Sequence, residues 1–155
     1  MDQLTLHRAA SFCAYQERTP DEVRQRLAQW EVAGEAADEI IAELISLNYL
    51  SQERFAKTFV SGKFRIKKWG RVRIKQELAR RGLDEASIKQ GMEEISNDTY
   101  EETLHQLLTK KQEQLLRAEP DAFKRKQKLV RFALSKGYES GVVWKVVNEV
   151  LTENG

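Results

Sequence analysis

Apolar residues recur along this chain at intervals of three and four, the spacing that places side chains on one face of an α-helix. The same four-then-three step occurs three times, at Ala37, Ile41 and Leu44, at Ile88, Met92 and Ile95, and at Val143, Val147 and Val150. Each set draws one apolar stripe down a helix. The pattern predicts nine helices, near residues 3–17, 20–31, 36–48, 52–64, 70–81, 85–96, 98–117, 121–136 and 140–152.

Capping residues support these boundaries. Thr19 to Glu22 reads as a capping box with Pro20 at the first helical position, and Ser51 and Asp84 are good N-caps. Asp98 with Glu101 is a second candidate capping box. Two glycines stand where a helix would end in a left-handed residue, Gly82 and Gly137.

Similar helices return at a spacing of about 50 residues, which is typical of repeat proteins. The residues 23–30, 74–82 and 129–137 share their apolar positions. We therefore predict an all-α fold, an elongated curved array of three tandem three-helix repeats, at 1–50 (acidic), 51–97 (strongly basic) and 98–155 (with a longer first helix). A compact helical bundle whose repeat is chance similarity is the alternative.

Composition excludes several classes of protein. A single cysteine, Cys13, forbids an intrachain disulfide, and no Cys/His cluster suggests zinc. No apolar run approaches the length of a membrane span, and the N-terminus lacks the features of a signal peptide, so we expect a cytoplasmic protein with no membrane contact. No nucleophile motif or phosphate-binding glycine loop indicates an enzyme or a cofactor. No heptad seam requires a dimer, which favours a monomer.

Charge is concentrated in the middle of the chain. Residues 54–81 hold eleven Lys or Arg and one acidic residue, Glu77, whereas the whole chain has a net charge of only +2. A basic segment of this kind favours phosphate groups or acidic protein surfaces as partners. A solvated surface balanced by the acidic repeats, including an Arg73–Glu77 pair, is the alternative.

The candidate binding residues come from this segment and from a weaker basic run near residue 128. They are Lys57, Lys63, Arg65, Lys67, Lys68, Trp69, Arg71, Arg73, Lys75, Arg80, Arg81, Lys124, Lys128 and Arg131.

The aromatic residues divide into three groups. Trp69 either stacks on a nucleic-acid base or anchors the turn to the core. We expect core positions for Phe64, Cys13 and also for Phe55, Phe59, Tyr49, Trp30 and Trp144. Ile74 and Leu78 should be buried on the helix near 70–81. For Tyr100 and Tyr138 the sequence does not decide between a core and a surface position.

The stretch 47–56, Leu-Asn-Tyr-Leu-Ser-Gln-Glu-Arg-Phe-Ala, resembles a signature of the RecX regulatory proteins. The motifs at 62–63, 70–74 and 77–83 resemble the central repeat of the same family. Residues 18–27 fit its first repeat, and the third repeat fits loosely. Two positions depart from the family pattern. Gln52 stands where the family usually has Asp, and Trp30 stands where a small residue or Gly is more usual.

The resemblance implies a protein of tandem three-helix repeats without enzymatic activity. RecX proteins bind filaments of the RecA recombinase on single-stranded DNA and lodge in the filament groove. There they block filament growth, ATP turnover and strand exchange. The residues alone leave two rivals open, a stand-alone module that binds naked DNA and a helical adaptor for another protein.

Overall fold

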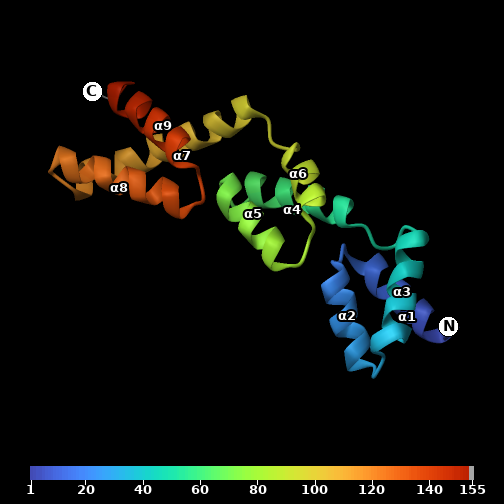
Figure 1. Ribbon diagram of the computed structural model, residues 1–155. Coiled ribbons are helices and arrows are strands. Elements are labelled where there is room, and N and C mark those ends of the chain that lie inside the picture. The colour runs from blue at the N-terminus through green and yellow to red at the C-terminus, as the bar shows by residue number, and fades with distance from the viewer. Residues whose placement is uncertain (154–155) are drawn as a thin grey trace. The chain divides into compact units, whose positions relative to one another are not determined.

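The computed structural model describes residues 1–153, and within that range every regular element is an α-helix (Figure 1). The helices are α1 (Gln3–Tyr15), α2 (Pro20–Gln29), α3 (Gly34–Ser46), α4 (Gln52–Arg65), α5 (Arg71–Arg80), α6 (Glu85–Met92), α7 (Asn97–Ala118), α8 (Ala122–Ser135) and α9 (Ser140–Glu153). This order confirms the predicted all-α fold and its three successive groups of three helices.

One helix boundary differs clearly from the prediction. α6 ends at Met92, four residues before the predicted end at residue 96. Ser96 has the extended backbone of an N-cap (φ −77°, ψ 150°), and its hydroxyl accepts a hydrogen bond from the Thr99 backbone N–H. Ser96 therefore begins α7 and cannot continue α6.

The predicted caps are present with one exception. The Thr19 hydroxyl accepts from the Glu22 N–H at 3.1 Å, and the Glu22 carboxylate accepts in return from the Thr19 N–H at 3.4 Å. Ser51 and Asp84 cap α4 and α6, since they accept from the backbone N–H groups of Arg54 and Ser87. The second capping box, Asp98 with Glu101, was predicted wrongly: Ser96 caps α7, and Asp98 lies inside the helix.

The chain divides into two compact units. Unit 1 comprises residues 1–59 and 77–92, and unit 2 comprises residues 60–76 and 93–155. Unit 1 has nine basic and thirteen acidic residues, and unit 2 has seventeen basic and eleven acidic residues. Positive charge is therefore a property of unit 2 as a whole, and the basic stretch 60–76 lies in the same unit as α8.

Unit 1 is organised around the packing of α1, α2 and α3 (Figure 1). Its core is formed by the apolar faces of these helices and includes Cys13, Val23, Leu27, Ile40 and Leu44. The Cys13 prediction is confirmed, because its side chain is buried. Trp30 packs against this core from its edge and remains half-buried.

Unit 2 is built on mutual contacts of α7, α8 and α9 (Figure 1). Leu104, Leu108, Leu129, Val143 and Val147 are fully buried in these helices. The aromatic rings of Phe64, Tyr100 and Tyr138 extend the interior towards the basic stretch. The ring centroids of Phe64 and Tyr100 are 5.9 Å apart, and those of Tyr100 and Tyr138 are 4.9 Å apart. This settles Tyr100 and Tyr138 as core residues and confirms the same prediction for Phe64.

Candidate partner-binding surface

Two loops of unit 2 meet through backbone atoms at the start of α5. The Gly70 N–H donates to the Lys136 carbonyl at 2.8 Å, and the Val72 N–H donates to the Gly137 carbonyl at 2.9 Å. The carbonyls of Lys136, the C-cap of α8, and of the following Gly137 thus satisfy the N–H groups of Gly70, just before α5, and of Val72 in the first turn of α5. We call this contact the glycine junction.

Glycine is required on both sides of the junction. A Cβ on Gly70 would lie 2.3 Å from the Gly137 carbonyl carbon, and a Cβ on Gly137 would lie 2.4 Å from the Arg73 Cβ. Gly137 also has a φ of +98°, in the left-handed region predicted from the sequence. Gly82 follows the same pattern in unit 1, with a φ of +84° and an added Cβ 2.1 Å from Asp21 Oδ2.

Side chains reinforce the glycine junction around Tyr100. The Tyr100 hydroxyl accepts from the Arg71 N–H at 2.9 Å and donates to the Glu139 carboxylate. The Tyr138 hydroxyl donates to the Lys68 carbonyl at 3.0 Å, and the Lys136 ammonium donates to the Lys67 carbonyl at 3.1 Å. Burial raises the pKa of both tyrosines well above the ordinary value, so both hydroxyls keep their protons.

Arg71, one of the predicted binding residues, is largely occupied inside unit 2. Its guanidinium lies 4.0 Å from the Tyr100 ring centroid, donates to the Asn97 amide oxygen at 2.7 Å and stands 3.7 Å from the Glu139 carboxylate. Only 19% of its side chain is exposed. These contacts give Arg71 a positioning role at the junction.

Trp69 lies between core and surface. Its ring is half-buried, with the Arg73 guanidinium 4.1 Å and the Lys63 ammonium 4.9 Å from the ring centroid. The indole therefore already makes cation–π contacts with side chains of the same protein. A nucleic-acid base that stacked on the ring would have to compete with Arg73. Glu77 pairs with Arg80 at 3.1 Å, so the Arg73–Glu77 pair that belonged to the alternative of a solvated surface is not formed.

The most available cations of the basic stretch precede and follow the glycine junction along the chain. Arg65, Lys67, Lys68 and Lys75 are all exposed, and none has an ion-pair partner among residues 1–153. All four belong to unit 2. Ile74 and Leu78 are fully buried, as predicted, and fix the direction in which α5 presents its charges.

The remaining basic residues of the middle repeat lie in unit 1. Lys57 and Arg80 are exposed, Arg80 being the partner of Glu77, and the Arg81 guanidinium lies 5.0 Å from the centroid of the half-buried Phe59 ring. Arg54 is committed to structure, since its guanidinium donates to Glu17 at 2.6 Å. The predicted binding residues are therefore not one continuous set but belong to two compact units.

The second basic run lies on α8, which contains five basic and no acidic residues. Lys124 and Arg131 are exposed, whereas Lys128 pairs with Glu119 at 2.9 Å. The hydrogen bond from Lys128 is the main cause that lowers the pKa of Glu119. Arg125 instead clamps the loop before the helix, because it donates to the carbonyls of Glu119 and Pro120.

Two aromatic residues predicted as core are exposed instead. Trp144 on α9 is 45% exposed, with the Lys126 ammonium 5.5 Å from its ring centroid, and Tyr49 is 42% exposed. The neighbours Val143, Val146 and Val147 already occupy the buried face of α9, so Trp144 is directed outward. The sequence pattern missed this residue because it lies at the edge of the apolar stripe.

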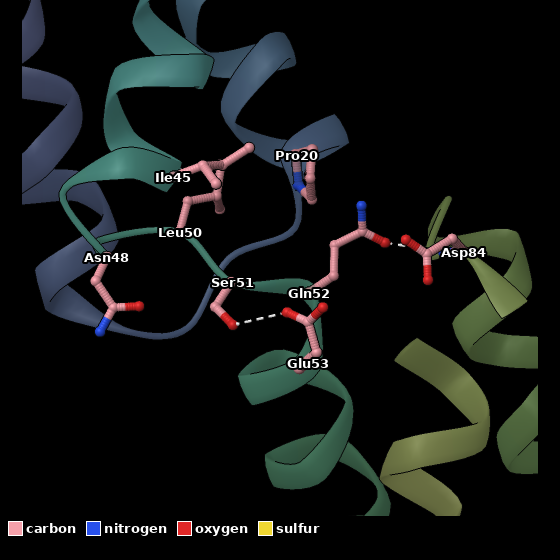
Figure 2. A pocket seen from close by; sticks show the side chains of 8 residues that line it. All are labelled: Pro20, Ile45, Asn48, Leu50, Ser51, Gln52, Glu53 and Asp84. Atoms are coloured by element: carbon pink, nitrogen blue, oxygen red, sulfur yellow. Dashed lines mark hydrogen bonds between the residues drawn. The ribbon is translucent and has the colours of Figure 1, made fainter. Parts of the chain in front are cut away.

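A hollow in unit 1 has a different character (Figure 2). It has a volume of about 230 Å³, and two carboxylates, Glu53 and Asp84, face it. The Gln52 amide oxygen accepts from the Asp84 N–H at 2.9 Å and so links the start of α4 to the start of α6 (Figure 2). Carboxylates repel phosphates, so this hollow is not part of the candidate surface.

Within residues 1–153, no helix is long and apolar enough to cross a membrane, and no group of three His, Cys, Asp or Glu side chains is placed to hold a metal ion. The basic stretch places ammonium and guanidinium groups beside an aromatic ring, as at Trp69.

Three protein-family models match this chain in order. They describe the first three-helix domain of RecX at residues 6–44, the second at 51–92 and the third at 98–147, and together they cover most of the chain. The chain belongs to the RecX family. The resemblance read from residues 18–27, 47–56 and the following motifs is thereby confirmed, including in the third repeat, where it was loose.

Relatives named "Regulatory protein RecX" agree with this assignment. The chain is 29% identical to that of Clostridium acetobutylicum over 149 residues, which is 95% of this chain and 69% of that protein. It is 32% identical to that of Clostridium perfringens (strain 13) over 137 residues, 88% of this chain and 63% of that protein. The chain thus spans between about half and two thirds of the length of the curated RecX relatives that it matches.

Two crystal structures share the fold. The structure of RecX from Lactobacillus salivarius superposes with a TM-score of 0.84 at 22% identity, covering 94% of both chains. A second structure of a regulatory protein RecX gives a TM-score of 0.80 at 21% identity, covering 93% of this chain and 72% of the other. At these identities the likeness speaks for the RecX fold alone.

Proposed function

We propose that this chain binds a filament of a RecA-type recombinase on single-stranded DNA. In this proposal it inhibits the ATPase, filament extension and strand exchange, and so modulates recombinational DNA repair and the SOS response. The observation that supports it best is the combination of RecX family membership with exposed, unpaired cations in unit 2. A recombinase–DNA filament presents both phosphates and acidic protein surface to such cations.

Inhibition in this proposal needs occupancy and no chemistry by this chain. Arg65, Lys67, Lys68 and Lys75 meet the negative surface, while the glycine junction holds the loop that carries Lys67 and Lys68 in place. A regulator seated on neighbouring recombinase subunits hinders their turnover and blocks addition of the next subunit. Because the contacts are electrostatic and exposed, inhibition should weaken as salt increases.

Charge reversal tests the proposal. The variant Lys68→Glu/Lys75→Glu should require at least about tenfold more protein to inhibit the single-strand-dependent ATPase of the recombinase, because two contacts become repulsive. The control Lys89→Glu/Lys110→Glu makes the same charge change at two exposed lysines outside the candidate surface. Equal inhibition by both variants would refute the assignment of the surface, provided that helical circular dichroism is unchanged.

A pull-down separates the proposed function from the stand-alone DNA module. Recombinase is offered to the chain with and without single-stranded DNA, at low and high salt, and naked DNA is offered alone. Retention of the filament together with weak binding of naked DNA supports the proposal. Tight binding of naked DNA with no added retention of recombinase would replace it with the DNA-binding module, whereas retention that salt does not weaken would indicate the helical adaptor.

A further inference from the structure

The hollow in unit 1 has an apolar wall and an acidic wall (Figure 2). The apolar wall comprises Pro20, Ile45 and Leu50. The acidic wall comprises Glu53 and Asp84, which lie below and to the right of the apolar side chains in Figure 2. A ligand group that matches both walls has an apolar stem and a cationic end, and the side chains of lysine and arginine are built in this way.

The two carboxylates of the hollow are held in place and carry their charge. The Ser51 hydroxyl donates to Glu53 at 3.2 Å, and the Ser87 N–H donates to Asp84 at 2.7 Å. The hydrogen bond from Ser87 is the main cause that lowers the pKa of Asp84. Neither carboxylate has an ion-pair partner in the part of the chain that the structure describes. The hollow therefore keeps negative charge that a ligand can neutralise, on groups that are oriented before the ligand arrives.

The turn that follows α3 exposes apolar side chains beside the hollow. Ile45 is 51% exposed, Leu47 is 50% exposed and Tyr49 is 42% exposed. Ile45 lines the hollow, and Leu47 and Tyr49 stand on either side of Asn48, which lines it as well. Neighbouring exposed apolar side chains with a polar rim are typical of a surface that another protein covers.

We propose that this hollow and the turn at residues 45–49 form a docking site for a protein segment that carries an arginine. The stem of the arginine packs on the apolar wall, and its guanidinium donates to Glu53 and Asp84. Apolar neighbours of the arginine cover Leu47 and Tyr49. Arginine fits better than lysine, because a guanidinium has five N–H donors and is more weakly hydrated than an ammonium. The inference rests on the proposed function and deepens it, because it gives unit 1 a contact with the recombinase itself, opposite in charge to the contacts of unit 2.

Size and charge favour a protein segment over other occupants of the hollow. Its volume of about 230 Å³ is smaller than the pockets of roughly 300–1,000 Å³ that hold drug-sized ligands. A Ca²⁺ ion takes about 6–8 oxygen ligands and would leave the apolar wall unused. Both carboxylates repel the phosphates of a nucleic acid. A protein segment can fill the hollow with one side chain and cover the neighbouring turn as well.

The test neutralises the two carboxylates and keeps their structural hydrogen bonds. In Glu53→Gln/Asp84→Asn the amide oxygens can still accept from Ser51 and Ser87, and asparagine is as good an N-cap as aspartate. Biolayer interferometry should show about tenfold weaker binding of the recombinase filament, although the variant has gained positive charge. Binding of naked single-stranded DNA should stay unchanged or become tighter. A general charge effect would strengthen both interactions, so the opposite sign for the filament identifies a site for a cation.

Three further variants define the site. Glu35→Gln/Glu39→Gln makes the same charge change on exposed side chains of α3 outside the hollow and should weaken neither interaction. Tyr49→Ala should weaken filament binding by about threefold, and the loss should persist at high salt because the contact is apolar. Tyr15→Ala, at an 84% exposed aromatic of unit 1, is its matched control and should have no effect.

A peptide probe examines the hollow without the recombinase. The tripeptide acetyl-Leu-Arg-Leu amide is titrated into the ¹⁵N-labelled chain, and the same peptide with citrulline, the neutral isostere of arginine, is the control. The arginine peptide should shift the amide resonances of residues 51–54 and 84–87, and the citrulline peptide should not. The inference is overturned if both peptides shift these resonances equally, if neither does, or if Glu53→Gln/Asp84→Asn binds the filament as tightly as an unaltered chain that does bind it.

The proposed function fails separately. If the unaltered chain neither binds the filament nor inhibits the recombinase ATPase, but the arginine peptide still gives its specific shifts, the filament function falls and the docking site stands. If inhibition is normal and neither the neutralised variant nor the arginine peptide has its expected effect, the docking site falls and the filament function stands.

Discussion

The glycine junction gives the sharpest stability prediction for unit 2. Replacement of Gly70 by alanine adds a Cβ that would lie 2.3 Å from the Gly137 carbonyl carbon, 2.4 Å from its oxygen and 2.4 Å from the Tyr138 nitrogen. These are backbone atoms of a loop held by hydrogen bonds on both sides, so no flexible side chain can move away. The two loops must separate, or the contact must break.

The expected cost follows from what separation removes. Overpacking of a tight site costs about 1–3 kcal/mol. Each of the two backbone hydrogen bonds at the junction, at 2.8 Å and 2.9 Å, contributes about 0.5–1.5 kcal/mol net. Overpacking strain together with weakening of the two hydrogen bonds should lower the free energy of unfolding by an amount on the order of 3 kcal/mol.

Gly62→Ala is the matched control. Gly62 lies inside α4 and an added Cβ would meet no heavy atom within 4 Å, so alanine should stabilise by up to ~1 kcal/mol through its helix propensity. Urea titration followed by circular dichroism measures both variants. Hydrogen exchange should show faster exchange in Gly70→Ala at residues 67–73 and 136–139. If the free energies of unfolding of Gly70→Ala and Gly62→Ala lie within about 1 kcal/mol of each other, the close backbone contact does not hold this loop.

Two further predictions concern buried titratable groups. Burial raises the pKa of Tyr100 and Tyr138 above the ordinary value of 10.0, so the native state keeps protons that the unfolded state releases. The free energy of unfolding is therefore unaffected by these groups below pH 10. As the pH rises from 10 towards the folded pKa, it falls by about 1.4 kcal/mol per pH unit for each tyrosine. Alkaline denaturation should therefore be less steep in Tyr100→Phe/Tyr138→Phe, and an unchanged slope would contradict the burial argument. Burial likewise raises the pKa of the Cys13 thiol, so a disulfide reagent should label it slowly in the native state and rapidly in urea; fast native labelling would show that the thiol is accessible.

The sequence predicts most of the fold because its signals are local. The capping box at Thr19 and the glycine at 137 act within one helical turn, so the structure reproduces them. The error at Asp98 has the same origin, since Ser96 is an equally good cap two residues earlier and the pattern does not rank them. The prediction of a buried Trp144 is wrong for a related reason. The residue lies at the edge of the apolar stripe of α9, and only the tertiary packing decides whether a residue at that edge is buried.

The candidate surface could be predicted only in composition. The excess of positive charge in residues 54–81 is visible in the sequence, but the commitment of Arg71 to Tyr100, Asn97 and Glu139 is not. Those partners lie more than 25 residues away along the chain, and the contact depends on how α7 and the loop before α9 fold back. The distribution of the basic residues over two compact units also required the tertiary structure.

The glycine junction is formed largely by main-chain atoms, which every amino acid possesses. The exposed side chains of α5 and α8 are therefore independent of the contact that joins the two loops. Charge on these helices can be reversed, moved or erased while the hydrogen bonds from Gly70 and Val72 stay in place. For protein engineering, unit 2 is thus a scaffold whose recognition residues can be recoded for a different anionic ligand, provided that glycine is kept at positions 70 and 137.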